Sequence, residues 1–222
     1  MTGLAGLRRY ARPDAAARAR AIARGAGGDA GAARERCEMC DEALGDRHGH
    51  VVDLERRSLA CTCRACYLLF TGEGAGGGRY RSVPDRVCHD PDRPLTASDW
   101  DALGIPVGTA FFFHHSGLDQ IVASYPSPAG ATECELDLSA WGRLAADRPL
   151  CSALRPDVEA LFVTRTDGGI ETYLIPIDEC YALVGRIRLS WSGLDGGQEV
   201  RDALASFAAD LRGRARLLGT EE

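Results

Sequence analysis

The chain has 222 residues, of which 45% are hydrophobic and 26% charged, and its formal net charge is −6. This composition is typical of a globular protein that can bury a core. The acidic balance gives no overall attraction to nucleic acid, and no apolar run approaches the roughly twenty residues of a membrane-spanning helix.

The first residues contain an arginine pair, Arg8 and Arg9, which is one part of a twin-arginine export signal. No long apolar region follows this pair, so we do not expect an export signal. We therefore expect a cytoplasmic location, where reducing conditions disfavour a framework of disulfides.

Residues 1–35 are rich in alanine and arginine, and glycines interrupt them between Gly25 and Gly31. Alanine favours a helix, but few side chains here are large enough to anchor one. The pattern predicts a flexible arm. An arginine-rich arm that docks on an acidic partner is the alternative.

Five of the nine cysteines fall within thirty residues, as a Cys37-x-x-Cys40 pair followed by Cys61-Thr-Cys63-Arg-Ala-Cys66. Two Cys-x-x-Cys pairs about twenty residues apart are typical of a tetrahedral thiolate site, in which each pair supplies two sulfurs from one tight turn. Zn²⁺ accepts four thiolates without geometric strain. We therefore predict a structural zinc site formed by Cys37, Cys40, Cys63 and Cys66.

Residues 36–72 contain the elements expected around such a site. His50–Leu54 and Ser58–Cys61 are predicted strands joined by a polar turn, and a short helix is predicted from Cys66 to Gly72. A knuckle, a hairpin and a Cys-x-x-Cys at the start of a helix occur in this order in treble-clef zinc fingers, which this segment resembles. A segment this short cannot fold on apolar burial alone, so metal binding would supply much of its stability. Residues 73–94 are expected to be a linker.

Residues 95–222 show the pattern of an α+β domain. Thr109–His114 and Gln120–Tyr125 predict one hairpin, and Val158–Val163 and Glu171–Ile175 predict another. Helices are predicted at about 138–147, from an N-cap at Asp178 to Gly185, and at about 198–217. Residues 187–191 alternate as a strand does. Neighbouring hairpins with helices favour an antiparallel or mixed sheet covered by helices on one side.

Cys61 is the surplus thiol of the cysteine-rich segment. A buried strand cysteine is the simplest interpretation. The alternatives are a redox-active neighbour of the metal or a ligand of an iron–sulfur cluster, because cluster ligands are also thiolates.

His48 and His50 lie at the start of the first predicted strand, near the place where a His-Asn-His nuclease of treble-clef type carries its general base. The segment lacks the asparagine and the basic helix tail of that class, so polar surface residues are the preferred interpretation.

The other candidate groups favour structure over chemistry. His114 and His115 would point to opposite faces of a sheet, which prevents joint chelation. Cys88-His89 is expected in a solvated loop, and the residues from Tyr125 to Glu133 in a rigid structural turn or a loop that contacts a partner. Packing is the expected role of three isolated cysteines, Cys134, Cys151 and Cys180.

Nearly the whole chain from Cys37 onward resembles an uncharacterised bacterial family, a domain of unknown function associated with nickel–iron (NiFe) hydrogenase gene neighbourhoods. The resembling segments are Cys37–Cys40, Cys61–Cys66, Gly78–Arg81, Tyr125–Glu133 and Pro176–Gly185. The resemblance implies an accessory or maturation role and supplies no catalytic residues. Two functions follow: a non-catalytic zinc-binding accessory protein whose partner is a hydrogenase subunit or maturation factor, or a redox protein that passes electrons through an iron–sulfur centre or Cys61.

Overall fold

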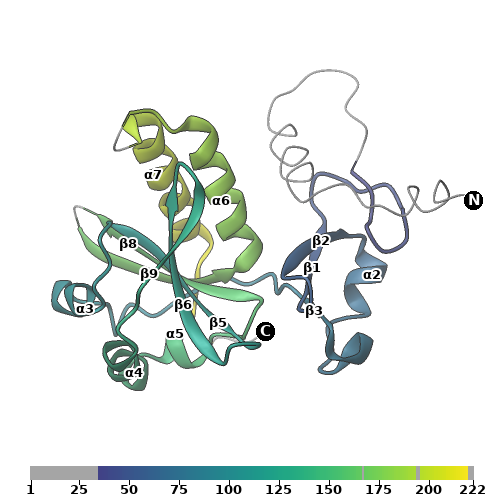
Figure 1. Cartoon of the computed structure of the whole chain (residues 1–222), viewed down its shortest axis with the longest axis horizontal. Coiled ribbons are helices and arrows are strands. Elements are labelled where there is room, and N and C mark those ends of the chain that lie inside the picture. Colours follow the sequence, from purple (N-terminus) through teal and green to yellow (C-terminus); the bar gives the residue numbers. More distant parts are fainter. Residues whose placement is uncertain (1–34, 167, 194–195, 220–222) are drawn as a thin grey trace, which may run out of the picture. The chain divides into compact units, whose positions relative to one another are not determined.

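The computed structural model describes residues 35–166, 168–193 and 196–219 (Figure 1). All but the last residue of the arm expected at 1–35 lies outside this range. The described part contains two sheets, which are taken in turn below.

The smaller sheet carries the cysteine-rich segment and has the strand order β2-β1-β3. Its elements are β1 (Gly49–Asp53), β2 (Ser58–Thr62), α2 (Arg64–Leu68), η3 (Ala75–Gly78) and β3 (Tyr80–Ser82). The predicted hairpin is confirmed, because β1 and β2 pair antiparallel from Gly49 opposite Thr62 to Asp53 opposite Ser58. The helix begins two residues earlier than predicted and ends at Leu68.

The larger sheet is mixed and has the order β10-β4-β9-β8-β5-β6-β7. Its strands are β4 (Cys88–His89), β5 (Thr109–His115), β6 (Gln120–Ser127), β7 (Gly130–Cys134), β8 (Glu159–Thr166), β9 (Gly169–Pro176) and β10 (Arg216–Leu217). Only β10 and β4 are parallel among the pairs of this sheet in the described chain. This is the α+β class that the sequence predicts. The expected linker range, 73–94, contains η3, β3 and β4.

Both predicted hairpins of this sheet are present, as β5–β6 and β8–β9. The expectation of a loop from Tyr125 to Glu133 is wrong for most of its length. β6 continues to Ser127, and β7 pairs with it from Gly130 onward, so only the turn between them remains. Cys88-His89 is likewise a strand and not a solvated loop, and Cys88 is buried opposite Leu174 of β9.

Helices cover both faces of the larger sheet (Figure 1), where the sequence suggested one. They are α3 (Ala97–Ala102), α4 (Leu138–Asp147), α5 (Pro149–Ser152), α6 (Ile177–Ser190) and α7 (Gly197–Arg214). Alternation along β8 supplies both cores: Leu161 and Val163 lie in the cluster with α3, α4 and α5. Ala160 and Phe162 lie in the cluster with α6 and α7. A strand buried on both faces is continuously apolar, so β8 could have indicated two helical layers.

The helix α6 corrects two predictions. It begins after Pro176 and continues through Gly185 to Ser190, so residues 187–191 do not form a strand. Ile187 is fully buried whereas Leu189 is 61% exposed, which a strand would not produce because it places both on one face. Ile187 lies one helical turn after Leu183, and both pack into the core. The predicted last helix is present as α7, and residues 216–217 form β10 instead of its end.

A third apolar cluster joins the smaller sheet to the larger domain. Val52 of β1 and Val83 after β3 pack with Val158 and Ile177. Arg81 of β3 also pairs with a carboxylate of the larger domain at 3.2 Å. The cysteine-rich segment is therefore in contact with the start of β8 and of α6.

Candidate metal centre

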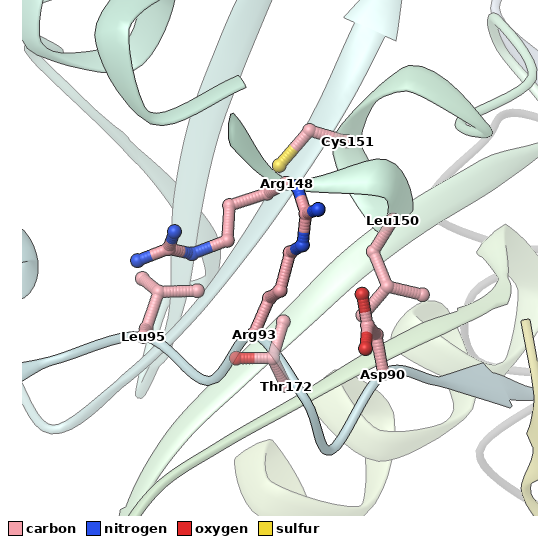
Figure 2. Close-up of a pocket in the computed structure, with 7 residues that line it drawn as sticks. All are labelled: Asp90, Arg93, Leu95, Arg148, Leu150, Cys151 and Thr172. Atoms are coloured by element: carbon pink, nitrogen blue, oxygen red, sulfur yellow. The ribbon is translucent and has the colours of Figure 1, made fainter. Parts of the chain in front are cut away.

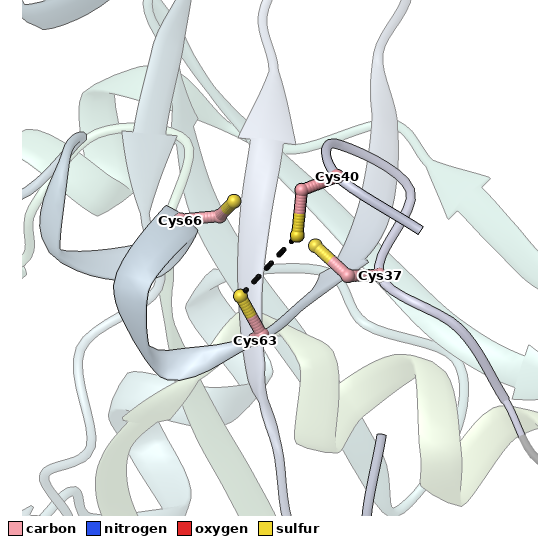
Figure 3. A group of neighbouring side chains, drawn as sticks. All are labelled: Cys37, Cys40, Cys63 and Cys66. Atoms are coloured by element: carbon pink, nitrogen blue, oxygen red, sulfur yellow. Dashed lines mark hydrogen bonds between the residues drawn. The ribbon is translucent and has the colours of Figure 1, made fainter. Parts of the chain in front are cut away.

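The four predicted ligands, Cys37, Cys40, Cys63 and Cys66, come together in the structure. Their sulfurs converge in Figure 3, and all lie within 4.8 Å of one another. Cys40 Sγ is 3.6 Å from Cys63 Sγ. Four sulfurs at these separations could hold a metal ion such as zinc.

The first pair of sulfurs comes from a tight turn closed by the backbone. The N–H of Asp41 donates to the carbonyl of Cys37 at 2.8 Å, and Asp41 takes a positive φ of 68°. Glu38 fastens this turn to β2: its N–H donates to the Cys61 carbonyl at 2.8 Å, and its carboxylate accepts from the Cys61 N–H at 3.1 Å.

The second pair comes from the start of α2. Cys63 is the N-cap residue, with extended backbone, and Cys66 is buried in the first turn. A helix N-terminus presents free N–H groups, which favour negative charge on nearby sulfur. The local backbone thus brings two sulfurs of each pair toward one point.

The thiols of this cluster are poised to lose protons to a cation. Burial raises the pKa of Cys37, but hydrogen bonds from the backbone of Cys63, Cys40 and Met39 outweigh it and lower that pKa to about 6. Burial and the neighbouring sulfurs raise the pKa of Cys66. Thiolate is the form that binds a metal, so a cation bound by the four sulfurs would displace their protons.

Cys61 is not one of the four, although it packs against this cluster. It belongs to a second group, in which His48, His50 and Cys61 each offer a ligand atom within 4.8 Å of the others. The sequence singled out all three residues without placing them together. The register of the hairpin could have done so, because His50 and Cys61 are directly opposite each other.

A residue that the sequence did not assign to any site completes this second group. Asp178 of α6 lies 128 positions from His50 and was expected only as a helix cap. Its Oδ2 accepts a hydrogen bond from His50 Nδ1 at 2.7 Å. Burial lowers the pKa of His50, but the bonds to Asp178 and Cys61 outweigh it and raise the pKa to about 10.

A pocket of about 580 Å³ opens beside the second group. His48, His50 and Asp178 line it, together with Arg64 and Tyr67 of α2. This volume is in the range of small-ligand sites. The pocket also touches Cys63 of the first cluster.

The scan against protein families matches residues 36–215 to DUF5947, a family of unknown function. The match spans well over half of the chain. The chain belongs to this family. The searches of curated proteins and of solved structures found no significant match.

The matched range contains a further pocket, between β4, α5 and β9 (Figure 2). Figure 2 shows the side chains of Arg93 and Arg148 in it beside Cys151. The space is too small to admit a water molecule, although Nε of Arg148 and Oγ1 of Thr172 are buried without a hydrogen-bond partner in the described chain. We assign no ligand to this pocket.

The remaining sequence candidates lie apart from the cysteine cluster. His114 Nε2 lies 3.2 Å from Asp119, and His115 accepts a bond from the Leu118 N–H. Neither histidine belongs to a metal-holding group of the described residues. The same is true of the other four cysteines, Cys88, Cys134, Cys151 and Cys180. Within the described ranges, no helix combines the length and apolar character needed to cross a bilayer.

Proposed function

We propose that the protein is a zinc-binding accessory protein that uses its cysteine-rich segment as a structural metal module. The observation that carries this proposal is the convergence of four cysteine sulfurs from two turns of one short segment. Four protein ligands complete the shell of Zn²⁺ and leave no position for substrate, as in structural zinc sites. The treble-clef-like order of knuckle, hairpin and helix supports the same assignment.

We further propose that the partner is a component of a nickel–iron hydrogenase system, either a subunit or a maturation factor. This assignment is supported by the resemblance of five segments between Cys37 and Gly185 to a family found near such genes. Among the described residues of the larger domain, Cys88, Cys134, Cys151 and Cys180 belong to no metal-holding group, which is compatible with an interaction role. A closed metal site and a domain of this kind suit an organising role better than turnover.

Metal analysis of the anaerobically purified protein tests the zinc proposal. Zinc without iron or sulfide, and no visible absorption, are expected, because Zn²⁺ is d¹⁰ and redox-inactive. Stoichiometric iron and sulfide would instead establish the redox alternative, which is motivated by Cys61 packing against the cluster.

A gene deletion and an affinity purification test the partner proposal. Deletion should reduce hydrogen uptake while growth on rich medium stays unchanged, and the tagged protein should recover a hydrogenase subunit or maturation factor. The tagged Cys37→Ser variant should recover less of that component, and Cys134→Ser, which alters a cysteine outside the cluster, should recover as much as the unaltered protein. Normal hydrogen uptake together with no recovered component would refute the assignment.

A further inference from the structure

The cluster of His48, His50 and Cys61 has the features of a second metal site. Its three ligand atoms lie within 4.8 Å of one another, and all three side chains are partly buried. From these contacts we propose that the cluster binds a second Zn²⁺ through two imidazoles and one thiolate, with one coordination position open. This inference goes beyond the proposed function and does not depend on any partner.

The β1–β2 hairpin brings two of the three side chains together, and His48 directly precedes β1. His50 and Cys61 are cross-strand partners in the β1–β2 hairpin, so their side chains share one face of the sheet. His48 precedes His50 by two residues, the spacing that returns to the same face of an extended chain. The Glu38 carboxylate holds the N–H of Cys61 and fixes the other side of the pair.

In both histidines Nδ1 is hydrogen-bonded to an oxygen, which leaves Nε2 for a metal. His48 Nδ1 lies 3.0 Å from the Gly45 carbonyl, which can only accept, so Nδ1 carries the proton. His50 Nδ1 donates to the Asp178 carboxylate at 2.7 Å. A histidine that binds zinc commonly donates its second N–H to a carbonyl or carboxylate in this way.

The nitrogen of His48 that faces away from Gly45 is an orphan. Its Nε2 is buried and has no hydrogen-bond partner among the described residues. The carboxylate of Glu35 lies 3.7 Å from it, which is too far for a hydrogen bond. Burying a polar nitrogen without a partner costs free energy, and a bound cation would remove that cost.

The donor set determines the kind of ion and of ligand. Two imidazoles and one thiolate suit Zn²⁺ better than Mg²⁺ or Ca²⁺, which prefer oxygen. Three protein ligands leave a fourth position, as in zinc sites that bind water or substrate. The pocket of about 580 Å³ lined by His48 and His50 gives a small donor ligand access to that position.

The unaltered full-length protein provides the first test. Metal analysis after loading with Zn²⁺ and removal of excess ion should give two zinc ions per chain. X-ray absorption at the zinc edge should then show nitrogen as well as sulfur ligands. One zinc per chain with sulfur ligands alone would overturn the proposal.

Variants assign the second ion to its ligands. His48→Ala and His50→Ala should each reduce the content to one zinc, whose ligands are all sulfur. Asp178→Asn keeps the shape of the side chain and should weaken binding of one ion about 10–100-fold, since an outer carboxylate typically contributes that much. His114→Ala is the matched control, because His114 also pairs with a carboxylate, Asp119, and should retain two ions.

Two further outcomes decide against the proposal. Two zinc ions in every one of these variants would place the second ion elsewhere. In the second outcome, the unaltered protein binds a single zinc ion, and iodoacetamide alkylates its Cys61 faster than it alkylates Cys61 of His50→Ala. This result would identify a thiolate–imidazole pair and not a metal site. Limited proteolysis within residues 36–72 confirms that the cysteine-rich segment of each variant is folded before its metal is counted.

Discussion

Replacing Cys37 with Ser should release the metal of the four-cysteine cluster and unfold residues 36–72, while the larger domain stays folded. The expectation follows from what holds each part together. The small sheet carries few apolar side chains, and Cys37 is one of the four cysteines that could hold a metal ion. The larger domain has two apolar cores of its own.

The free energies involved can be compared from the contacts. Binding of a structural zinc ion is worth about 10–16 kcal/mol in small zinc modules, which is more than such a segment can gain by burial. The larger domain would lose its apolar contact with Val52 and Val83. Full burial of a valine contributes about 1.5–3 kcal/mol, so loss of these two apolar contacts would cost the domain about 3–6 kcal/mol. Domains have a free energy of unfolding of about 5–15 kcal/mol, and a domain in all but the lowest part of this range stays folded at 25 °C after such a loss.

Tryptophan fluorescence can follow the larger domain alone, because all three tryptophans, Trp100, Trp141 and Trp191, lie beyond residue 95. At about 3 °C per kcal/mol, the Tm followed by this signal should fall by roughly 10–20 °C in the variant. Limited proteolysis should cut within residues 36–72 at 25 °C. Cys134→Ser is the control and should change neither result. Tryptophan emission of an unfolded chain at 25 °C would show that both parts fold as one unit and would refute the reasoning.

Two further predictions concern buried ion pairs. The guanidinium of Arg86 donates to both carboxylate oxygens of the fully buried Glu159, at 2.5 and 2.9 Å. Arg86→Ala leaves this buried charge without its partner and should lower the free energy of unfolding by about 3–5 kcal/mol, as measured by denaturant titration. Arg165→Ala, in an exposed pair, should cost less than about 1 kcal/mol, and equal costs would contradict this. The hydrogen bond from Arg79 lowers the pKa of Asp53 in the folded protein below the unfolded value of about 3.9. This ion pair therefore stabilises the fold above about pH 3.9, the unfolded pKa. The contribution is lost as the pH falls through the folded pKa. Asp53→Asn should therefore destabilise the protein at pH 7 and have a smaller effect at pH 2; an equal effect at both would refute the assignment.

The parts of the structure that the sequence predicted depend on local patterns. The spacing of Cys37, Cys40, Cys63 and Cys66 reflects what one metal ion requires from two turns, so the set can be read without knowing the fold. The hairpins β5–β6 and β8–β9 combine apolar strands with short polar turns. The helix α4 begins after Asp137, whose carboxylate caps it, and is predicted at its observed bounds.

The parts that the sequence missed depend on contacts between distant residues. The pattern of residues 187–191 fits a strand locally, and only the core beneath Leu183 and Ile187 makes it the end of α6. The strand β4 is too short to recognise and exists because Leu174 of β9 lies opposite it. Asp178 meets His50 only once α6 lies against the small sheet, so no spacing in the sequence could join them.

The hairpin β1–β2 links the two proposed metal sites, so that metal binding at the second site depends on the first but not the reverse. Cys63 follows β2 directly, so a metal on the four-cysteine cluster anchors the strand end that carries Cys61. A slip of one residue would turn Cys61 away from His50 and destroy the second site, whereas the four-cysteine cluster needs neither histidine. Cys37→Ser should therefore lose both zinc ions, and His50→Ala only one. Retention of one ion with nitrogen ligands in Cys37→Ser would show that the second site forms independently of the first.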